Sequence, residues 1–187
     1  GVQTCYRRPE FPAHAGVPEM ADLAPDATVY LCPQSLFKIH PDMDAPLAEI
    51  LRRDPKGVLW LFEGLDNVVT DRLRARWSGP FADVAGRVRF LPRVTVDRFL
   101  GILAAADVLL DTWPFGGGNT SYQGFAAGVP IVTLPGKYLR GRGTLAHYRH
   151  MGFSDCVAET PDSYVDIAVR LGTDPAFHAR IAGLIAE

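Results

Sequence analysis

A glycine-rich turn in the middle of the chain has the residue types of an anion site. It runs from Asp111 to Ser121, and three consecutive glycines in it precede Asn-Thr-Ser. Glycines let the backbone approach a ligand closely, and the first N–H groups of a following helix can bind an anion. The turn is neither a Walker loop nor a GxGxxG fingerprint, and the alternative is an ordinary turn that caps a helix. We predict a diphosphate cradle made of Gly117, Gly118, Asn119, Thr120 and Ser121.

A second polar cluster, Gln34, Ser35 and Lys38, directly follows the first apolar run. A lysine supplies a point charge for a phosphate leaving group, and Gln34 or Ser35 can hydrogen-bond to the same group. The alternative for Lys38 is a solvated surface lysine. Gln123 lies one turn into the helix after the glycine loop, where its side chain could reach ribose hydroxyls.

Two other groups of polar residues are less specific. Lys137, Arg140 and Arg142 bring three cations together, and these can hold an anion, bond to helix ends or contact a partner domain. His147 and His150 have a spacing that can serve a metal, but no HExxH pattern accompanies them. We interpret the two histidines as structural or surface residues and expect no metal and no other cofactor.

Short apolar runs alternate with amphipathic stretches from Ala27 onward, as in βαβ units. Runs such as Val58 to Phe62 are continuously apolar, which indicates strands buried on both faces. The sequence predicts an α/β fold, a Rossmann-like parallel sheet of about six strands flanked by helices. The expected strands are Thr28 to Cys32, Val58 to Phe62, Val88 to Leu91, Val108 to Leu110, Ile131 to Leu134 and a weak one at Asp155 to Val157. The expected helices are Asp44 to Arg53, Asn67 to Trp77, Val96 to Ala106, Thr120 to Ala127, Thr144 to Met151, Asp162 to Leu171 and a last one ending at Ile185.

Length and composition exclude several classes of protein. The chain has 187 residues, of which 48% are hydrophobic and 21% charged, as in one ordinary globular domain. The net charge of -2 argues against a nucleic-acid partner. No apolar run or signal peptide indicates a membrane. The three cysteines, Cys5, Cys32 and Cys156, form no CxxC pair, so we expect a reducing, cytoplasmic location.

The first 26 residues differ from the rest. Pro9, Pro12, Pro18 and Pro25 and the lack of periodicity predict an extended linker lying on a surface. The chain also begins with Gly rather than Met. We therefore expect residues 1–26 to be a linker from a missing N-terminal half and residues 27–187 to be the ordered domain.

Four segments in register resemble one family. They are Leu36 to Pro41, Ala105 to Thr112, Gly116 to Ser121 and Ala127 to Leu134. Because these segments occur in the same order and at the same spacing, the chain resembles the C-terminal half of the O-linked N-acetylglucosamine transferases and SPINDLY-like glycosyltransferases. The resemblance extends over about 150 residues. The resemblance implies the GT-B fold, with residues 27–187 as its nucleotide-sugar-binding domain.

The resemblance also implies roles for single residues. Lys38 corresponds to the lysine that contacts the diphosphate and stabilises the departing UDP, which is electrostatic catalysis. Gly118, Asn119 and Thr120 fall on the phosphate-binding loop, and Gln123 falls on the acidic residue that binds ribose. The remaining positions near the nucleotide-sugar are Gln34, Ser35, Arg93, Val94, Val96, Phe99, Gly117 and Ser121.

Several of these positions depart from the family pattern. Val96 and Phe99 stand where the family usually has a Lys or His and a His, and Gln123 replaces an acid. Gly118 stands where the family often has His or Thr. We hypothesise that Arg93 or Arg98 supplies the missing charge.

The expected function is inverting, metal-independent transfer of GlcNAc or a related hexose from a UDP-sugar to a protein side chain. The acceptor contacts, the catalytic base and the tetratricopeptide repeats of the family lie N-terminal to this region, so the fragment alone is expected to be inactive. The expected partners are a UDP-sugar and a protein acceptor, with no nucleic acid and no membrane. The alternatives are an epimerase-like GT-B domain and a degenerate nucleotide-binding or interaction module.

Overall fold

The computed structural model describes residues 6–11 and 17–187. Its centre is a five-stranded parallel sheet with the order β3-β2-β1-β4-β5. The strands are β1 (Thr28–Cys32), β2 (Gly57–Phe62), β3 (Val88–Leu91), β4 (Val108–Leu110) and β5 (Ile131–Val132). The strand order reverses direction between β1 and β4, and ligands of open parallel sheets bind beyond the strand ends at such a point.

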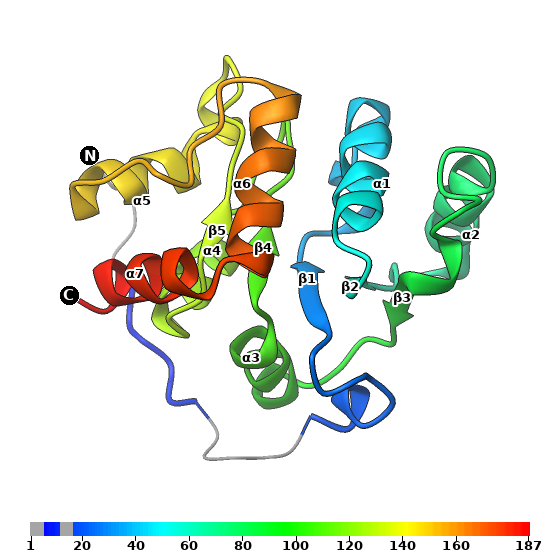
Figure 1. Ribbon diagram of the computed structural model, residues 1–187, viewed down its shortest axis with the longest axis horizontal. Helices are drawn as coiled ribbons and strands as arrows, with labels where there is room; N and C mark the ends of the chain where they lie inside the picture. Colours follow the sequence, from blue (N-terminus) through cyan, green and yellow to red (C-terminus); the bar gives the residue numbers. More distant parts are fainter. Residues whose placement is uncertain (1–5, 12–16) are drawn as a thin grey trace.

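Helices cover both faces of this sheet, and Figure 1 shows α1 and α6 above it and α3 below it. The α-helices are α1 (Asp44–Arg53), α2 (Asn67–Trp77), α3 (Val96–Ala105), α4 (Asn119–Ala126), α5 (Gly143–Met151), α6 (Pro161–Thr173) and α7 (Pro175–Ala186). The short 3-10 helices are η1 (Pro18–Met20), η2 (Leu36–Lys38), η3 (Pro41–Met43), η4 (Ala85–Arg87) and η5 (Leu139–Gly141). Side-chain caps begin several α-helices, among them Asp66, Thr95 and Asp174.

The core has one hydrophobic cluster on each face of the sheet. Along β1, Tyr30 and Cys32 belong to one cluster, and Val29 and Leu31 belong to the other. Successive side chains of a strand point to opposite faces, so an apolar strand of this kind must be covered on both. The fully buried side chains of β1 confirm the parallel, doubly covered sheet expected from the sequence.

The sixth expected strand is reduced to a single contact. Val157 forms an isolated parallel bridge with Thr133, and no ladder extends from it. The bridge consists of the Thr133 N–H, which donates to the Cys156 carbonyl, and the Ala158 N–H, which donates to the Thr133 carbonyl. The next edge groups of β5, the N–H and carbonyl of Ile131, both bond to the Tyr148 hydroxyl and therefore do not extend the ladder. Most α-helices begin and end within two residues of the expected positions.

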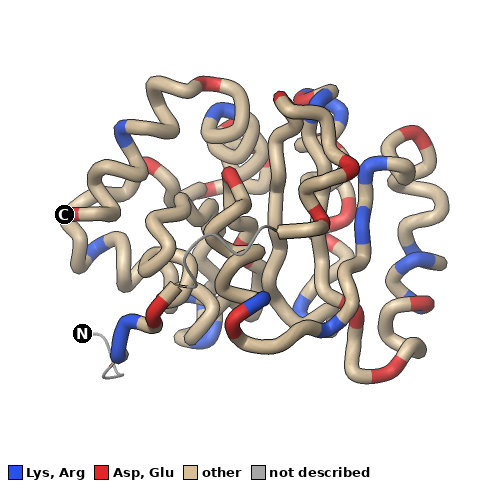
Figure 2. Tube along the Cα trace, turned by 90° about the horizontal axis from the view of Figure 1, so that it is seen from below, with Lys and Arg blue, Asp and Glu red and all other residues tan. Residues whose placement is uncertain are grey.

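The described part of the first 26 residues packs against the sheet domain. Val17, Met20 and Leu23 contact the cluster that contains Leu31, and Glu19 forms an ion pair with Arg98 at 2.7 Å. Acidic and basic residues are scattered over the described part of the chain in Figure 2. None of the described helices is both long and apolar enough to cross a membrane.

Candidate functional site

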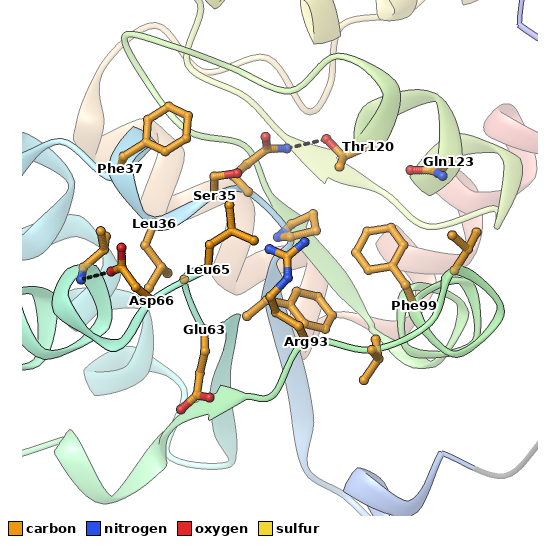
Figure 3. Close-up of a pocket in the computed structure, with 17 residues that line it drawn as sticks. Ser35, Leu36, Phe37, Glu63, Leu65, Asp66, Arg93, Phe99, Thr120 and Gln123 are labelled. Atoms are coloured by element: carbon orange, nitrogen blue, oxygen red, sulfur yellow. Dashed lines mark hydrogen bonds between the residues drawn. The ribbon is translucent and has the colours of Figure 1, made fainter.

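The loops that leave β1, β2 and β3, together with the start of α4, surround a pocket of about 480 Å³ (Figure 3). These loops meet at the carboxyl edge of the sheet, beside the point between β1 and β4 where the strand order reverses. The pocket therefore lies where the fold places a ligand. The predicted residues that line it are Gln34, Ser35, Arg93, Val94, Val96, Phe99, Thr120 and Gln123.

Lys38 lies at the end of η2, beside this pocket rather than in its lining. Its Nζ donates to Gln34 Oε1 at 2.9 Å and to the Gly116 carbonyl at 3.1 Å. The ammonium also lies 4.3 Å from the centre of the Phe115 ring. Partial burial lowers the pKa of Lys38 from its ordinary value, and the nearby Asp111 carboxylate acts in the opposite direction. These contacts hold the cation in one place, unlike a freely solvated surface lysine.

Gln34 connects Lys38 to the glycine loop. Its Nε2 donates to Thr120 Oγ1 at 2.6 Å, while its Oε1 accepts from Lys38. Thr120 is the second residue of α4, and the N–H groups of Asn119 and Thr120 have no acceptor within the helix. The Thr120 hydroxyl keeps its own hydrogen for another acceptor. An ammonium, a hydroxyl and two free N–H groups therefore gather at one place, and all of them are suited to phosphate oxygens.

The structure separates the five predicted loop residues into two groups. Gly118 and Asn119 are exposed, and Thr120 is half-buried in the pocket wall. Gly117 and Ser121 are buried: the Gly117 N–H donates to Asp111 Oδ1, and Ser121 Oγ hydrogen-bonds to Thr144 Oγ1 at 3.0 Å. Gly117 and Ser121 thus shape the loop from within.

Asp111, at the end of β4, is the site residue that the sequence analysis missed. Its carboxylate is 2% exposed and accepts hydrogen bonds from the Thr112 and Gly117 N–H groups and from the Thr133 and Thr144 hydroxyls. Burial raises the pKa of this carboxyl, and the four donors act against that shift. The one signal in the sequence is an acid that directly follows an apolar strand.

The other end of the pocket is apolar. Phe99 packs against Phe62 with ring centres 5.3 Å apart, and Val94 and Val96 border them. Gln123 reaches this end from α4 (Figure 3). An apolar wall of this kind suits a flat aromatic group, and the polar Gln123 offers hydrogen bonds at the edge of that group.

The two arginines proposed to supply charge have different surroundings. Arg93 lines the pocket and points into the space between Leu65 and Phe99 (Figure 3). Arg98 is held by Glu19 at 2.7 Å and does not line the pocket. The geometry therefore favours Arg93 over Arg98 as a ligand-binding cation.

The cations after β5 do not line the pocket. Arg142 donates to the Gly136 carbonyl at 2.9 Å, and Arg140 and Lys137 lie over the Tyr138 ring. His147 packs against the rings of Tyr122 and Phe125. In residues 6–11 and 17–187, no three His, Cys, Asp or Glu side chains are grouped so that they could hold a metal ion.

Comparison with known proteins matches residues 16–186 to the model of glycosyl transferase family 41. A UDP-N-acetylglucosamine--peptide N-acetylglucosaminyltransferase of Caenorhabditis elegans is 31% identical over 159 residues, which are 81% of this chain and 13% of that protein. A probable UDP-N-acetylglucosamine--peptide N-acetylglucosaminyltransferase SPINDLY of Solanum lycopersicum is 29% identical over 47% of this chain and 10% of its own length.

A solved structure of the Thermobaculum terrenum O-GlcNAc transferase, the K341M mutant, superposes with a TM-score of 0.78 at 31% identity. The match covers 94% of this chain and 34% of that one. The chain thus spans about a third of this solved relative and a much smaller part of the curated ones.

Proposed function

Because the chain belongs to glycosyl transferase family 41, we propose that it is the donor-binding domain of an enzyme that transfers a sugar from a UDP-sugar to a protein side chain. The sheet and its helices form a Rossmann-like domain of the GT-B fold, and the solved relative matches 94% of this chain. GlcNAc or a related hexose is the sugar we propose, in line with the names of the relatives.

The observation that carries this proposal is the contact chain from Lys38 through Gln34 to Thr120. It brings an ammonium to the start of α4, where a diphosphate would find hydrogen-bond donors from both elements. With the phosphates at this end, the base and ribose extend toward Phe99 and Gln123 along the pocket. The pocket volume of about 480 Å³ is in the range of small-molecule sites.

Lys38 has the catalytic role in this proposal. When the bond between the sugar C1 and the phosphate oxygen breaks, its electron pair stays on that oxygen, and negative charge develops on the departing UDP. The Lys38 ammonium and the α4 N–H groups stabilise that charge where it forms. The acceptor hydroxyl attacks C1 from the opposite face, which inverts the anomeric configuration, and its proton passes to a base that we place outside these 187 residues.

Three further parts of the proposal concern the longer protein. We propose that transfer needs no metal because Lys38 and α4 supply the positive charge. Acceptor binding belongs to a part beyond this chain, so the chain alone binds donor without turnover. A cytoplasmic location is supported by Cys32 and Cys156, which are buried free thiols.

Calorimetric titration of this chain with UDP and with GDP tests the proposal. We expect saturable binding of UDP that is weakened about tenfold or more in Lys38→Ala, the effect of losing a charge-assisted contact to phosphate. Lys137→Ala is the matched control, because Lys137 is exposed and lies outside the pocket lining. Absence of UDP binding, or equal UDP affinity in Lys38→Ala, contradicts the proposal.

A further inference from the structure

The peptide unit between Gly116 and Gly117 makes two hydrogen bonds in opposite directions. Its N–H, on Gly117, donates to Asp111 Oδ1 at 2.6 Å. Its carbonyl, on Gly116, accepts from Lys38 Nζ at 3.1 Å. The N–H and C=O of a trans peptide are fixed in one plane and point to opposite sides. The orientation of this single peptide therefore couples Asp111 to Lys38.

The Asp111 carboxylate is itself fixed from several elements. Besides Gly117, Oδ1 accepts from the Thr112 N–H at 2.9 Å. On the other side, Oδ2 accepts from Thr133 Oγ1, which follows β5, at 2.8 Å and from Thr144 Oγ1, on α5, at 2.7 Å. A buried carboxylate with four donors has little freedom to rotate, because each movement leaves a buried polar group unpaired. Asp111 is thus a rigid acceptor for the Gly117 N–H.

The two glycines allow side chains to approach this peptide from both directions. A Cβ on Gly116 would lie 3.1 Å from one Asp111 carboxylate oxygen. A Cβ on Gly117 would lie 2.8 Å from Gln34 Nε2. A side chain at Gly116 would therefore crowd the carboxylate, and one at Gly117 would overlap Gln34 and Ser121.

We propose that Asp111 is the positioning residue for Lys38: it fixes the Gly116–Gly117 peptide so that the Gly116 carbonyl holds the ammonium beside the start of α4. This inference rests on the proposed function, in which Lys38 contacts the donor diphosphate. Without the carboxylate, the peptide is free to turn its N–H toward Lys38. The N–H hydrogen and the ammonium repel each other, so the cation would leave its place.

A double-mutant cycle on UDP affinity tests this coupling. Asp111→Ala is expected to weaken UDP binding about tenfold in the otherwise unchanged chain, the size of one lost charge-assisted contact. In the Lys38→Ala background the same change is expected to have an effect within about twofold, because the residue through which Asp111 acts is absent. Asp111→Asn keeps an oxygen that can accept from Gly117, so its UDP affinity should stay within about threefold of the unchanged chain.

A matched variant separates positioning from general stability. Asp54 is a second buried carboxylate, and it is also 2% exposed. It lies just before β2, at the opposite end of the sheet from Asp111, and accepts a hydrogen bond from Tyr30 Oη at 2.9 Å. Asp54→Ala should lower the melting temperature and leave UDP affinity unchanged. If Asp111→Ala does not fold, Gly116→Ala takes its place, since its Cβ would lie 3.1 Å from the same carboxylate and crowd it.

The outcomes distinguish the positioning role of Asp111 from the proposed function of the chain. If the unchanged chain does not bind UDP, the proposed function fails and this inference fails with it. If the unchanged chain binds UDP but the Asp111 and Lys38 effects add, only the inference is overturned. An Asp54→Ala variant that loses as much UDP affinity as Asp111→Ala overturns it as well.

Discussion

Lys38 is half-buried beside Phe115, and burial lowers the pKa of its ammonium below the ordinary value of 10.5, while Asp111 and Cys32 act to raise it. A phosphate is bound by the protonated form. UDP affinity should therefore be highest below this pKa and decline as the pH rises through it. The decline should begin at a lower pH than it would with an exposed lysine.

Titration of UDP between about pH 7 and about pH 10 measures this decline. Lys38→Ala serves as the control, because without the ammonium its weaker affinity should not show the same step. A decline of the same size in Lys38→Ala as in the unchanged chain would contradict a role for the Lys38 charge.

Arg93 and Arg98 form a matched pair for a second prediction at this scale. Arg93→Ala should weaken UDP binding several-fold, because the guanidinium points into the pocket. Arg98→Ala should leave UDP affinity unchanged, because Arg98 is paired with Glu19. Calorimetry measures the UDP affinity of both variants. An equal loss of UDP affinity in the two would contradict the assignment of Arg93, and not Arg98, as the ligand-binding cation.

The sequence predicts the site residues that have local signals, but not those whose role depends on contacts with distant residues. Lys38 and Thr120 were predicted because residue type and a strand end are local signals, whereas Phe99 was predicted only from the family resemblance. The role of Asp111 depends on the Thr133 and Thr144 hydroxyls, which are 22 and 33 residues away and reach it only after folding. The choice between Arg93 and Arg98 likewise depends on Glu19, which is 79 residues from Arg98.

At the scale of elements, α4 determines the position of the candidate phosphate site. Gly124 lies against the sheet, where an added Cβ would overlap Leu109 Cδ1 and lie 3.1 Å from Ile131 Cδ1. Gly124→Ala should push α4 outward and lower the free energy of unfolding by about 1–3 kcal/mol, the usual effect of overpacking. UDP affinity should fall too, because α4 carries Thr120 and Gln123.

Gly183, on α7, is the control for this prediction, because a Cβ there meets no atom within 4 Å. Gly183→Ala should stabilise the chain by about 0.5–1 kcal/mol, since alanine favours a helix more than glycine does. Urea unfolding measures both variants. Equal effects of the two substitutions would show that α4 has room at Gly124.

The elements themselves were largely predictable, because apolar runs and helix caps act over a few residues. The strands β1 to β4 match the expected runs closely. The expected strand at Asp155 to Val157 became an isolated bridge, since the next edge groups of β5, the N–H and carbonyl of Ile131, bond to the Tyr148 hydroxyl. Edge pairing of this kind depends on the neighbouring strand, which a local pattern does not contain.

At the scale of the whole molecule, the first 26 residues were expected to be a linker on the surface. Their described part covers apolar side chains below the sheet through Val17, Met20 and Leu23. Deletion of residues 1–26 should therefore lower the free energy of unfolding by on the order of a few kcal/mol. UDP affinity should change little, because residues 6–11 and 17–26, the described part of this segment, do not line the pocket.

Urea unfolding of the shortened chain, beside UDP calorimetry, checks this prediction. Glu19→Gln provides the smaller, matched change, since it weakens only the pair with Arg98. Unchanged stability on deletion would show that the segment merely lies on the surface.

In the proposed complex, UDP lies with its diphosphate between Lys38 and the start of α4. The most direct test is a titration of the isotopically labelled chain with UDP, followed by amide chemical shifts in NMR spectra. We expect the shifted amides to cluster at residues 34–38, 93–99 and 118–123, with little change in the separate groove between Trp77 and Phe90. Shifts confined to that groove, or no shifts at saturating UDP, would contradict this placement of UDP.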